Sequence, residues 1–249
     1  MWSRIKQAYG DSARILTALP LLFALPVAAE LVQHFIEYRA GMFASVEAME
    51  ATAADAGRMG FGQVKVLVLM LLPFWVARWH FFRGRRDRPI LGDRRSIMLY
   101  VPVVLLGIAI GLVQQFGGSL LSPYVPDARV LMAIGFLFFA ATVVLDVYLT
   151  AWKIGAALGN PRMTIPASFR VMHGNFWWSL GFFVVMFLPL MVVHYGLNGL
   201  AIGKPDGLLW TILAIDSLVV GYLGLVLAMT TVLMAGRAAE RSGVALVAA

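Results

Sequence analysis

The chain has 249 residues, of which 61% are hydrophobic and only 13% are charged, and its mean hydropathy is +0.83. An average soluble domain is about 45–50% apolar and about 25% charged. The composition therefore excludes an ordinary soluble globular protein. The chain contains no cysteine, which also excludes disulfide bonds, thiolate metal sites and cysteine nucleophiles.

The apolar residues gather into six long runs, each close to the roughly 20 residues that a helix needs to cross a bilayer. The sequence therefore predicts an all-α fold: a polytopic transmembrane helical bundle of six spans, forming a single integral membrane domain over residues 1–249. Tryptophan and tyrosine residues near the ends of the runs agree with an interfacial aromatic belt. The predicted spans cover residues 15–36, 64–82, 97–116, 130–152, 176–194 and 208–234.

The formal net charge of +7 comes from basic residues that are unevenly distributed. Fifteen of the 20 lysines and arginines lie before the first span, at the second and fourth connections, or after the last span. Positively charged residues gather on the cytoplasmic side of membrane proteins. Both termini are therefore predicted to be cytoplasmic.

Three connections have a pattern of their own. Residues 41–62 have helical apolar spacing and are predicted to form an external amphipathic segment. Residues 164–173 have apolar and basic faces and predict a short interfacial helix.

The third connection, residues 83–95, is an arginine-rich cytoplasmic loop. It either determines topology only, or also binds anionic lipid head groups or an acidic partner. The candidate lipid-binding residues are Arg83, Arg85, Arg86, Arg88, Arg94 and Arg95.

Three acidic residues fall inside predicted spans, where an unpaired charge costs at least about 2.5–3.5 kcal/mol. Glu30 and Asp216 are both expected roughly 10 Å below the outer surface, from a rise of about 1.5 Å per residue. Asp146 lies nearer the inner surface, where pairing with Lys153 or with an inner arginine is expected. His34 follows Glu30 by one helical turn, and His194 ends the fifth predicted span on the same outer side.

These positions predict a candidate proton-binding or ion-binding site made of Glu30, His34, Asp216 and His194. A carboxylate beside an imidazole can exchange a proton near neutral pH. Two alternatives stay open. Glu30, His34 and His194 can hold a divalent metal ion, because imidazole and carboxylate are ordinary metal ligands; or the acids are structural and hydrogen bond across helices.

A stretch before the fifth span carries a resemblance to a known family. The residues that carry it are Ala167-Ser168-Phe169-Arg170-Val171-Met172-His173-Gly174-Asn175-Phe176-Trp177-Trp178, followed by a leucine- and proline-rich span and, after the last span, a basic end. With its six spans, the chain resembles the bacterial membrane domain associated with glycerophosphodiester phosphodiesterases. The resemblance implies a multi-pass protein of the bacterial cytoplasmic (inner) membrane and assigns no reaction. The loops are too short to encode the hydrolase itself.

The functional hypothesis is a transporter-like or lipid-interacting membrane protein. The alternative is a non-catalytic accessory or assembly subunit of a membrane complex. No nucleophile and base stand together and no metal motif is present, so we expect no enzymatic activity, no cofactor and no metal ion. Expected partners are membrane lipids, including anionic ones, and a membrane protein; nucleic acid is not expected.

The six-span topology can be tested with reporter fusions. Fusions after Arg88 and after Arg241 should report a cytoplasmic position, because they follow basic connections. Fusions near Glu50, Asp127 and Asp206 should report an external position. A cytoplasmic signal at Glu50 would overturn the six-span arrangement.

Overall fold

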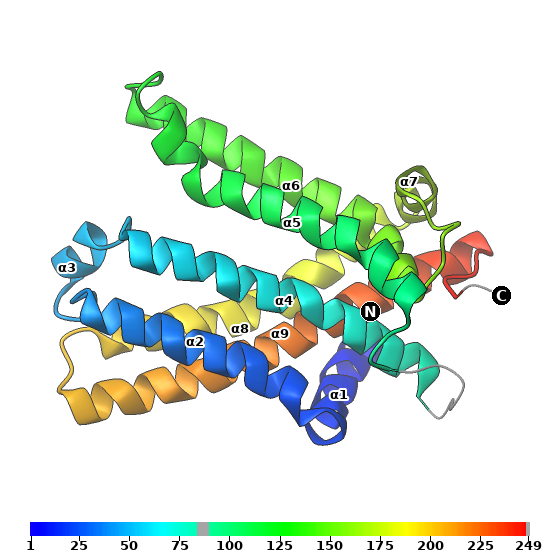
Figure 1. Ribbon diagram of the computed structural model, residues 1–249, viewed down its shortest axis with the longest axis horizontal. Helices are drawn as coiled ribbons and strands as arrows, with labels where there is room; N and C mark the ends of the chain where they lie inside the picture. Colours follow the sequence, from blue (N-terminus) through cyan, green and yellow to red (C-terminus); the bar gives the residue numbers. More distant parts are fainter. Residues whose placement is uncertain (84–89, 248–249) are drawn as a thin grey trace. The chain divides into compact units, whose positions relative to one another are not determined.

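The computed structural model describes residues 1–83 and 90–247, and within them all regular secondary structure is α-helical (Figure 1). Six of the described helices are long and apolar enough to cross a membrane, which confirms the predicted six-span bundle of a multi-pass membrane protein. They are α2 (Pro20–Arg39), α4 (Ala56–Phe82), α5 (Arg94–Leu121), α6 (Ala128–Ala157), α8 (Phe176–Ala201) and α9 (Asp206–Ser242). Three shorter helices are α1 (Trp2–Ala18), α3 (Val46–Ala51) and α7 (Ile165–His173).

The chain forms two compact units. Unit 1 consists of Met1–Leu72 and Phe182–Thr230, and unit 2 of Pro73–Gly181 and Thr231–Ala249. The divisions fall inside α4, α8 and α9, so each of these helices contributes one part to each unit.

The first predicted span is corrected at its beginning. Residues from Ile15 were expected to start this span, but they belong to α1, and the helix breaks at Leu19 (φ −141°, ψ 65°). The residue before a proline is disfavoured in helical geometry, whereas proline itself suits the first helical position. Pro20 therefore begins α2 instead of interrupting the span.

The other long helices extend beyond their predicted apolar runs.

The two predicted connecting segments form helices in the structure. Part of the segment 41–62 forms the short helix α3, where Ser45 Oγ accepts a hydrogen bond from the Ala48 N–H at 3.1 Å. The end of that segment, from Ala56, belongs to α4. The interfacial helix predicted over residues 164–173 corresponds to α7.

Close helix packing in unit 1 depends on two glycines of α9. A Cβ at Gly221 would collide with Val27 and Phe23 of α2, and a Cβ at Gly224 would lie 2.8 Å from Leu72 of α4. Small residues of this kind let membrane helices approach each other closely. The α9 segment that carries Asp216 is thereby held against α2 and α4.

Unit 2 contains a fully buried arginine, Arg78, in the last part of α4. Its Nη1 donates to the Ala157 carbonyl at 2.9 Å, and its Nη2 lies 3.1 Å from Asp93 Oδ2. Asp93 also caps α5 by accepting from the Ser96 N–H at 2.9 Å. This hydrogen bond, with the nearby Arg78 guanidinium, holds the pKa of Asp93 below its ordinary value. One arginine thus joins the end of α4, the end of α6 and the start of α5.

The expected pairing of Asp146 with Lys153 is present on α6. The short helix α7 packs on α6 through Ser168, which donates to the Tyr148 carbonyl at 2.6 Å and accepts from the Trp152 N–H at 2.9 Å. The phenyl ring of Phe169 stacks on Tyr148 at 4.8 Å.

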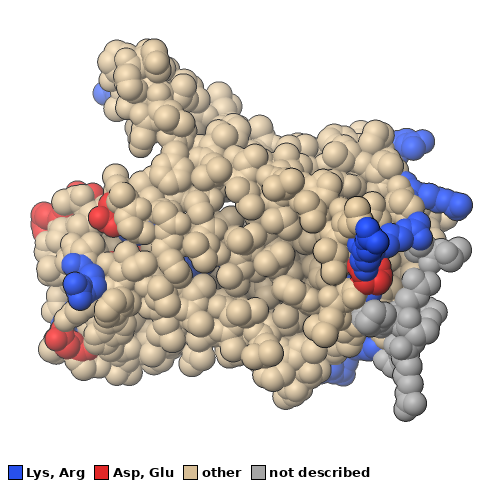
Figure 2. All heavy atoms as spheres, in the orientation of Figure 1, with Lys and Arg blue, Asp and Glu red and all other residues tan. Residues whose placement is uncertain are grey.

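On the face of the molecule that Figure 2 shows, charged side chains gather at the ends of the units. In unit 1, acidic and basic side chains stand together over α3 (Figure 2). In unit 2, lysine and arginine side chains gather where α7 and the end of α9 lie, and the visible surface along α5 and α6 is almost free of charge (Figure 2).

Replacing the buried arginine, Arg78→Leu, should lower the free energy of unfolding by about 2–4 kcal/mol, because two charge-assisted hydrogen bonds are lost and Asp93 is left without its guanidinium. Thermal unfolding of the purified protein in neutral detergent would measure this loss. Arg94→Leu is the matched control, since Arg94 is exposed at the start of α5. Equal unfolding temperatures for the two variants would contradict the assigned role of Arg78.

Candidate functional site

The candidate site is a set of ionisable side chains inside unit 1, here called the buried polar cluster. Its central members are almost fully buried: Asp216 is 0% exposed, and Glu30 and His34 are each 1% exposed. Four helices that lie together in unit 1 supply it (Figure 1). The members are Glu30, Gln33, His34 and Glu37 on α2, Arg58 and Lys65 on α4, His194 and Asn198 on α8, and Asp216 on α9.

Helix geometry places the α2 members on one face. Glu30, Gln33, His34 and Glu37 occupy positions i, i+3, i+4 and i+7. Residues at this spacing share one side of a helix. Because that side is buried, all four side chains point into the unit rather than towards lipid.

Both ring nitrogens of His34 face carboxylates. Nδ1 lies 3.2 Å from Glu37 Oε2, and Nε2 lies 2.9 Å from Asp216 Oδ2 and 3.6 Å from Glu30 Oε1. An ionised carboxylate can only accept hydrogen bonds, and a neutral imidazole has one N–H donor. Satisfying both short contacts therefore requires one additional proton, on His34 or on a carboxylate beside it.

Asp216 lies between two imidazoles. Its Oδ1 is 2.8 Å from His194 Nδ1, and its Oδ2 accepts from Asn198 Nδ2 at 2.9 Å in addition to its contact with His34. A neutral His194 with its proton on Nδ1 satisfies this arrangement. The result is an imidazole–carboxylate–imidazole sequence that links α2, α9 and α8.

Two basic residues of α4 pair with the acids of α2. Lys65 Nζ lies 2.9 Å from Glu30 Oε2, and Arg58 Nε lies 3.0 Å from Glu37 Oε1. The Lys65 and Arg58 side chains are 24% and 32% exposed, whereas their partners are 2% and 7% exposed. The cluster thus reaches the surface of the protein through its cationic members.

The charges of the cluster balance when it holds one additional proton. With both imidazoles neutral, three carboxylates face one ammonium and one guanidinium, so the net charge is −1. One added proton makes the cluster neutral. Since net charge is expensive in an apolar environment, the neutral protonated state is the one that burial favours.

Three ligand atoms also meet the loose geometry of a metal site. They belong to Glu30, His194 and Asp216, and all lie within 4.8 Å of one another. Lys65 Nζ already lies 2.9 Å from Glu30 Oε2, so a metal ion bound by Glu30 would compete with this ion pair.

The structure brings together all four residues selected from the sequence: Glu30, His34, His194 and Asp216. His194 does not end its helix as expected, because α8 continues to Ala201. Five members were not among the candidates selected from the sequence: Gln33, Glu37, Arg58, Lys65 and Asn198. Lys65 could have been selected, because it lies inside the predicted span 64–82, where a charged side chain needs a partner.

The arginines selected as lipid-binding candidates fall into two groups. Arg83, Arg94 and Arg95 are exposed, and Arg83 lies over the Trp79 ring at 5.2 Å. The other three, Arg85, Arg86 and Arg88, lie outside the described residues.

The fold and the cluster define a multi-pass helical membrane protein with a buried ionisable network. Comparison of the chain with protein-family models, curated proteins and solved structures finds no match. The resemblance to the membrane domain associated with glycerophosphodiester phosphodiesterases stays a prediction.

The Lys65 ion pair can be tested through stability. Lys65→Met leaves the buried Glu30 carboxylate without its ammonium partner and should lower the free energy of unfolding by about 1–3 kcal/mol. Adding Glu30→Gln should restore part of this loss, because the variant pair then carries no unpaired charge. Chemical unfolding in neutral detergent would measure both effects.

Lys204→Met is the control for this experiment, since Lys204 is an exposed lysine between α8 and α9. A Lys65→Met protein as stable as the control would contradict the importance of the pair.

Proposed function

We propose that the protein is a transporter-like membrane protein whose buried polar cluster binds and releases one proton. The observation that carries this proposal is the position of Asp216 between His34 and His194, inside helices that are otherwise apolar. Ionisable groups at such positions commonly serve proton or ion pathways. The predicted charge asymmetry supports placement in the bacterial cytoplasmic membrane, with the cluster towards the outer side.

His194 is the entry point for the proton in this proposal, because its side chain is 14% exposed while that of Asp216 is fully buried. A proton binds Nε2 of His194, and the proton already on Nδ1 passes to Asp216 Oδ2 at 3.0 Å, so one N–H bond breaks and one O–H bond forms. The same Oδ2 then gives this proton to Nε2 of His34 at 2.9 Å, where His34 carries its other proton on Nδ1. In this second transfer the O–H bond breaks, an N–H bond forms, and Asp216 is again a carboxylate.

Proton release changes the connection between two helices. Protonated His34 donates to Glu37 on its own helix and to Asp216 on α9. Neutral His34 has one N–H donor and can serve only one of these acids. Loss of the proton therefore weakens either the contact within α2 or the contact that joins α2 to α9, which couples protonation to helix packing.

A second candidate function is the non-catalytic accessory or assembly subunit. It is favoured by the complete pairing of the cluster, since Glu30, Glu37 and Asp216 each have a basic or imidazole partner. In that case the network holds α2, α4, α8 and α9 together and transfers no proton.

Proton flux into liposomes distinguishes the two functions. Purified protein would be reconstituted with a pH-sensitive dye inside the vesicles, and a pH step applied with the membrane potential held at zero. We expect wild-type protein to acidify the interior faster than empty liposomes do. Asp216→Asn and His34→Gln should reduce the rate to that of empty liposomes, because each variant removes one proton-carrying group.

Asp146→Asn and His173→Gln are matched controls from unit 2 and should keep the wild-type rate. Unfolding temperatures would show that every variant is folded. Wild-type flux equal to that of empty liposomes, or folded Asp216→Asn protein with full flux, would contradict the proton pathway and support the structural alternative.

A further inference from the structure

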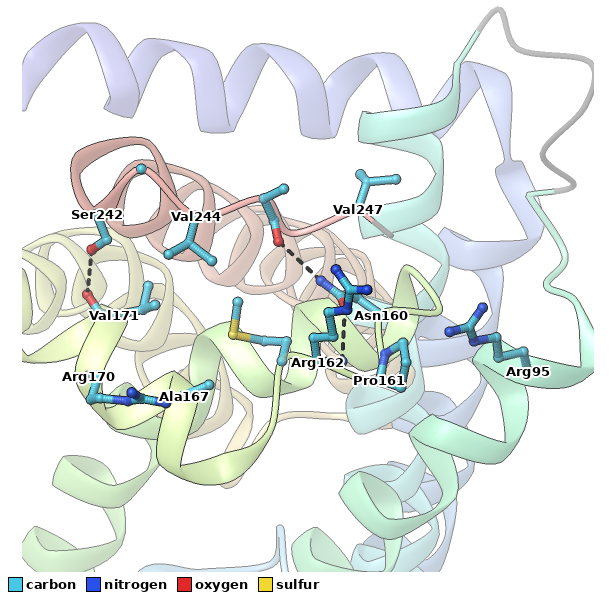
Figure 3. A pocket seen from close by; sticks show the side chains of 13 residues that line it. Arg95, Asn160, Pro161, Arg162, Ala167, Arg170, Val171, Ser242, Val244 and Val247 are labelled. Carbon is cyan, nitrogen blue, oxygen red and sulfur yellow. Dashed lines mark hydrogen bonds between the residues drawn. The ribbon is translucent and has the colours of Figure 1, made fainter. Parts of the chain in front are cut away.

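A second polar site lies in unit 2, in a cavity of about 930 Å³ (Figure 3). Its wall comes from the start of α5, the connection between α6 and α7, the helix α7, and the chain at the end of α9. Sites for small ligands commonly have volumes of about 300–1,000 Å³. The cavity is therefore large enough for a head group or a small molecule.

Side-chain hydrogen bonds hold the cavity wall in place. Asn160 Nδ2 donates to the carbonyls of Ala245 and Leu246, each at 3.1 Å, and its Oδ1 accepts from the Arg162 N–H at 3.0 Å. Gly243 has a φ of +63°, which turns the chain at the end of α9. The segment after α9 is thus fixed against the connection between α6 and α7, and the cavity does not need a ligand to form its wall.

Three arginines line the cavity: Arg95, Arg162 and Arg170. All three are exposed, and Figure 3 shows that they come from separate parts of the chain. Among the described residues, no aspartate or glutamate lines the cavity and no carboxylate pairs with any of these arginines. The cavity therefore concentrates positive charge that no acid in the described part of the chain neutralises.

Part of the lining is apolar. Val171, Val244 and Val247 share the cavity with the three arginines. A guanidinium group binds phosphate oxygens with paired hydrogen bonds, whereas valine side chains contact hydrocarbon. The cavity thus presents the two chemical surfaces of an anionic phospholipid, a charged head group and its adjoining carbon chain.

We propose that this cavity binds a phosphate-bearing anion, and that its source is the head group of an anionic lipid. The phosphate lies among Arg95, Arg162 and Arg170, and the apolar part of the lipid lies against the valines. The proposal is independent of proton binding, because none of these residues belongs to the buried polar cluster. It also places lipid binding largely outside the loop 83–95, with which it shares only Arg95.

Isothermal titration calorimetry in neutral detergent would test the site with four probes: dihexanoyl phosphatidic acid, dihexanoyl phosphatidylcholine, glycerol 3-phosphate and inorganic phosphate. We expect phosphatidic acid to bind, and phosphatidylcholine, whose phosphate is neutralised by choline, to bind at least about tenfold more weakly. Glycerol 3-phosphate and phosphate should also bind more weakly than phosphatidic acid, because they lack the carbon chains. Equal affinity for glycerol 3-phosphate would overturn the lipid source and identify a soluble phosphate ligand.

Variants of the arginines test the position of the site. Arg162→Gln combined with Arg170→Gln should weaken phosphatidic acid binding by at least about tenfold, since two charge-assisted contacts are lost. Arg95→Gln should also weaken binding. Arg129→Gln is the control, because Arg129 is an exposed arginine of unit 2 that does not line the cavity.

Two results would overturn the proposal. One is wild-type protein that binds none of the phosphate-bearing probes. The other is binding that is equally strong in the wild type, in the double variant and in Arg129→Gln. Unfolding temperatures near that of the wild type are expected for all variants, because the substituted side chains are exposed.

Discussion

The structure of unit 1 depends on one constraint, which is that charges buried among apolar helices must be paired. Three carboxylates lie in the buried polar cluster, and each unpaired charge would cost several kcal/mol in such surroundings. His34 meets this constraint for two helices at once, because its ring contacts Glu37 on α2 and Asp216 on α9. Lys65 and Arg58 extend the same pairing to α4, and His194 extends it to α8. The relative positions of these four helices therefore follow from electrostatics as much as from packing.

Much of this arrangement could be predicted from the sequence. The features that predict it depend on neighbouring residues or on the regular rise per residue of an α-helix. Apolar runs predicted six helices, and the i, i+4 spacing of Glu30 and His34 placed them on one face. The matching depth of Glu30 and Asp216 followed from the constant rise of a straight helix. The break at Leu19 was missed, although Pro20 marked it, because proline is also tolerated inside membrane helices.

The partners of the buried charges could not be predicted from the sequence. An ion pair between two helices forms only if the helices pack against each other and are rotated so that the two side chains meet. In the sequence, Arg78 counts among the basic residues of the second, cytoplasmic connection, and Arg58 among the five basic residues of the external connections. In the structure Arg78 is fully buried against Asp93 and the Ala157 carbonyl, while Arg58 closes the edge of the buried polar cluster. A count of charges per connection cannot reveal these contacts, because it contains no information on how the helices are rotated or which side chains meet.

The two polar sites differ in charge balance, and this difference explains their different burial. The buried polar cluster becomes neutral with one additional proton, so it can be enclosed by apolar helices. Within the described part of the chain, the cavity of unit 2 is lined by three arginines and by no acidic residue, so burying these arginines to the same degree would cost several kcal/mol each. Its arginines are accordingly exposed. Positive charge without an acidic partner at the surface is stabilised by an anion, whereas the charges of the buried polar cluster are already balanced once it holds one additional proton.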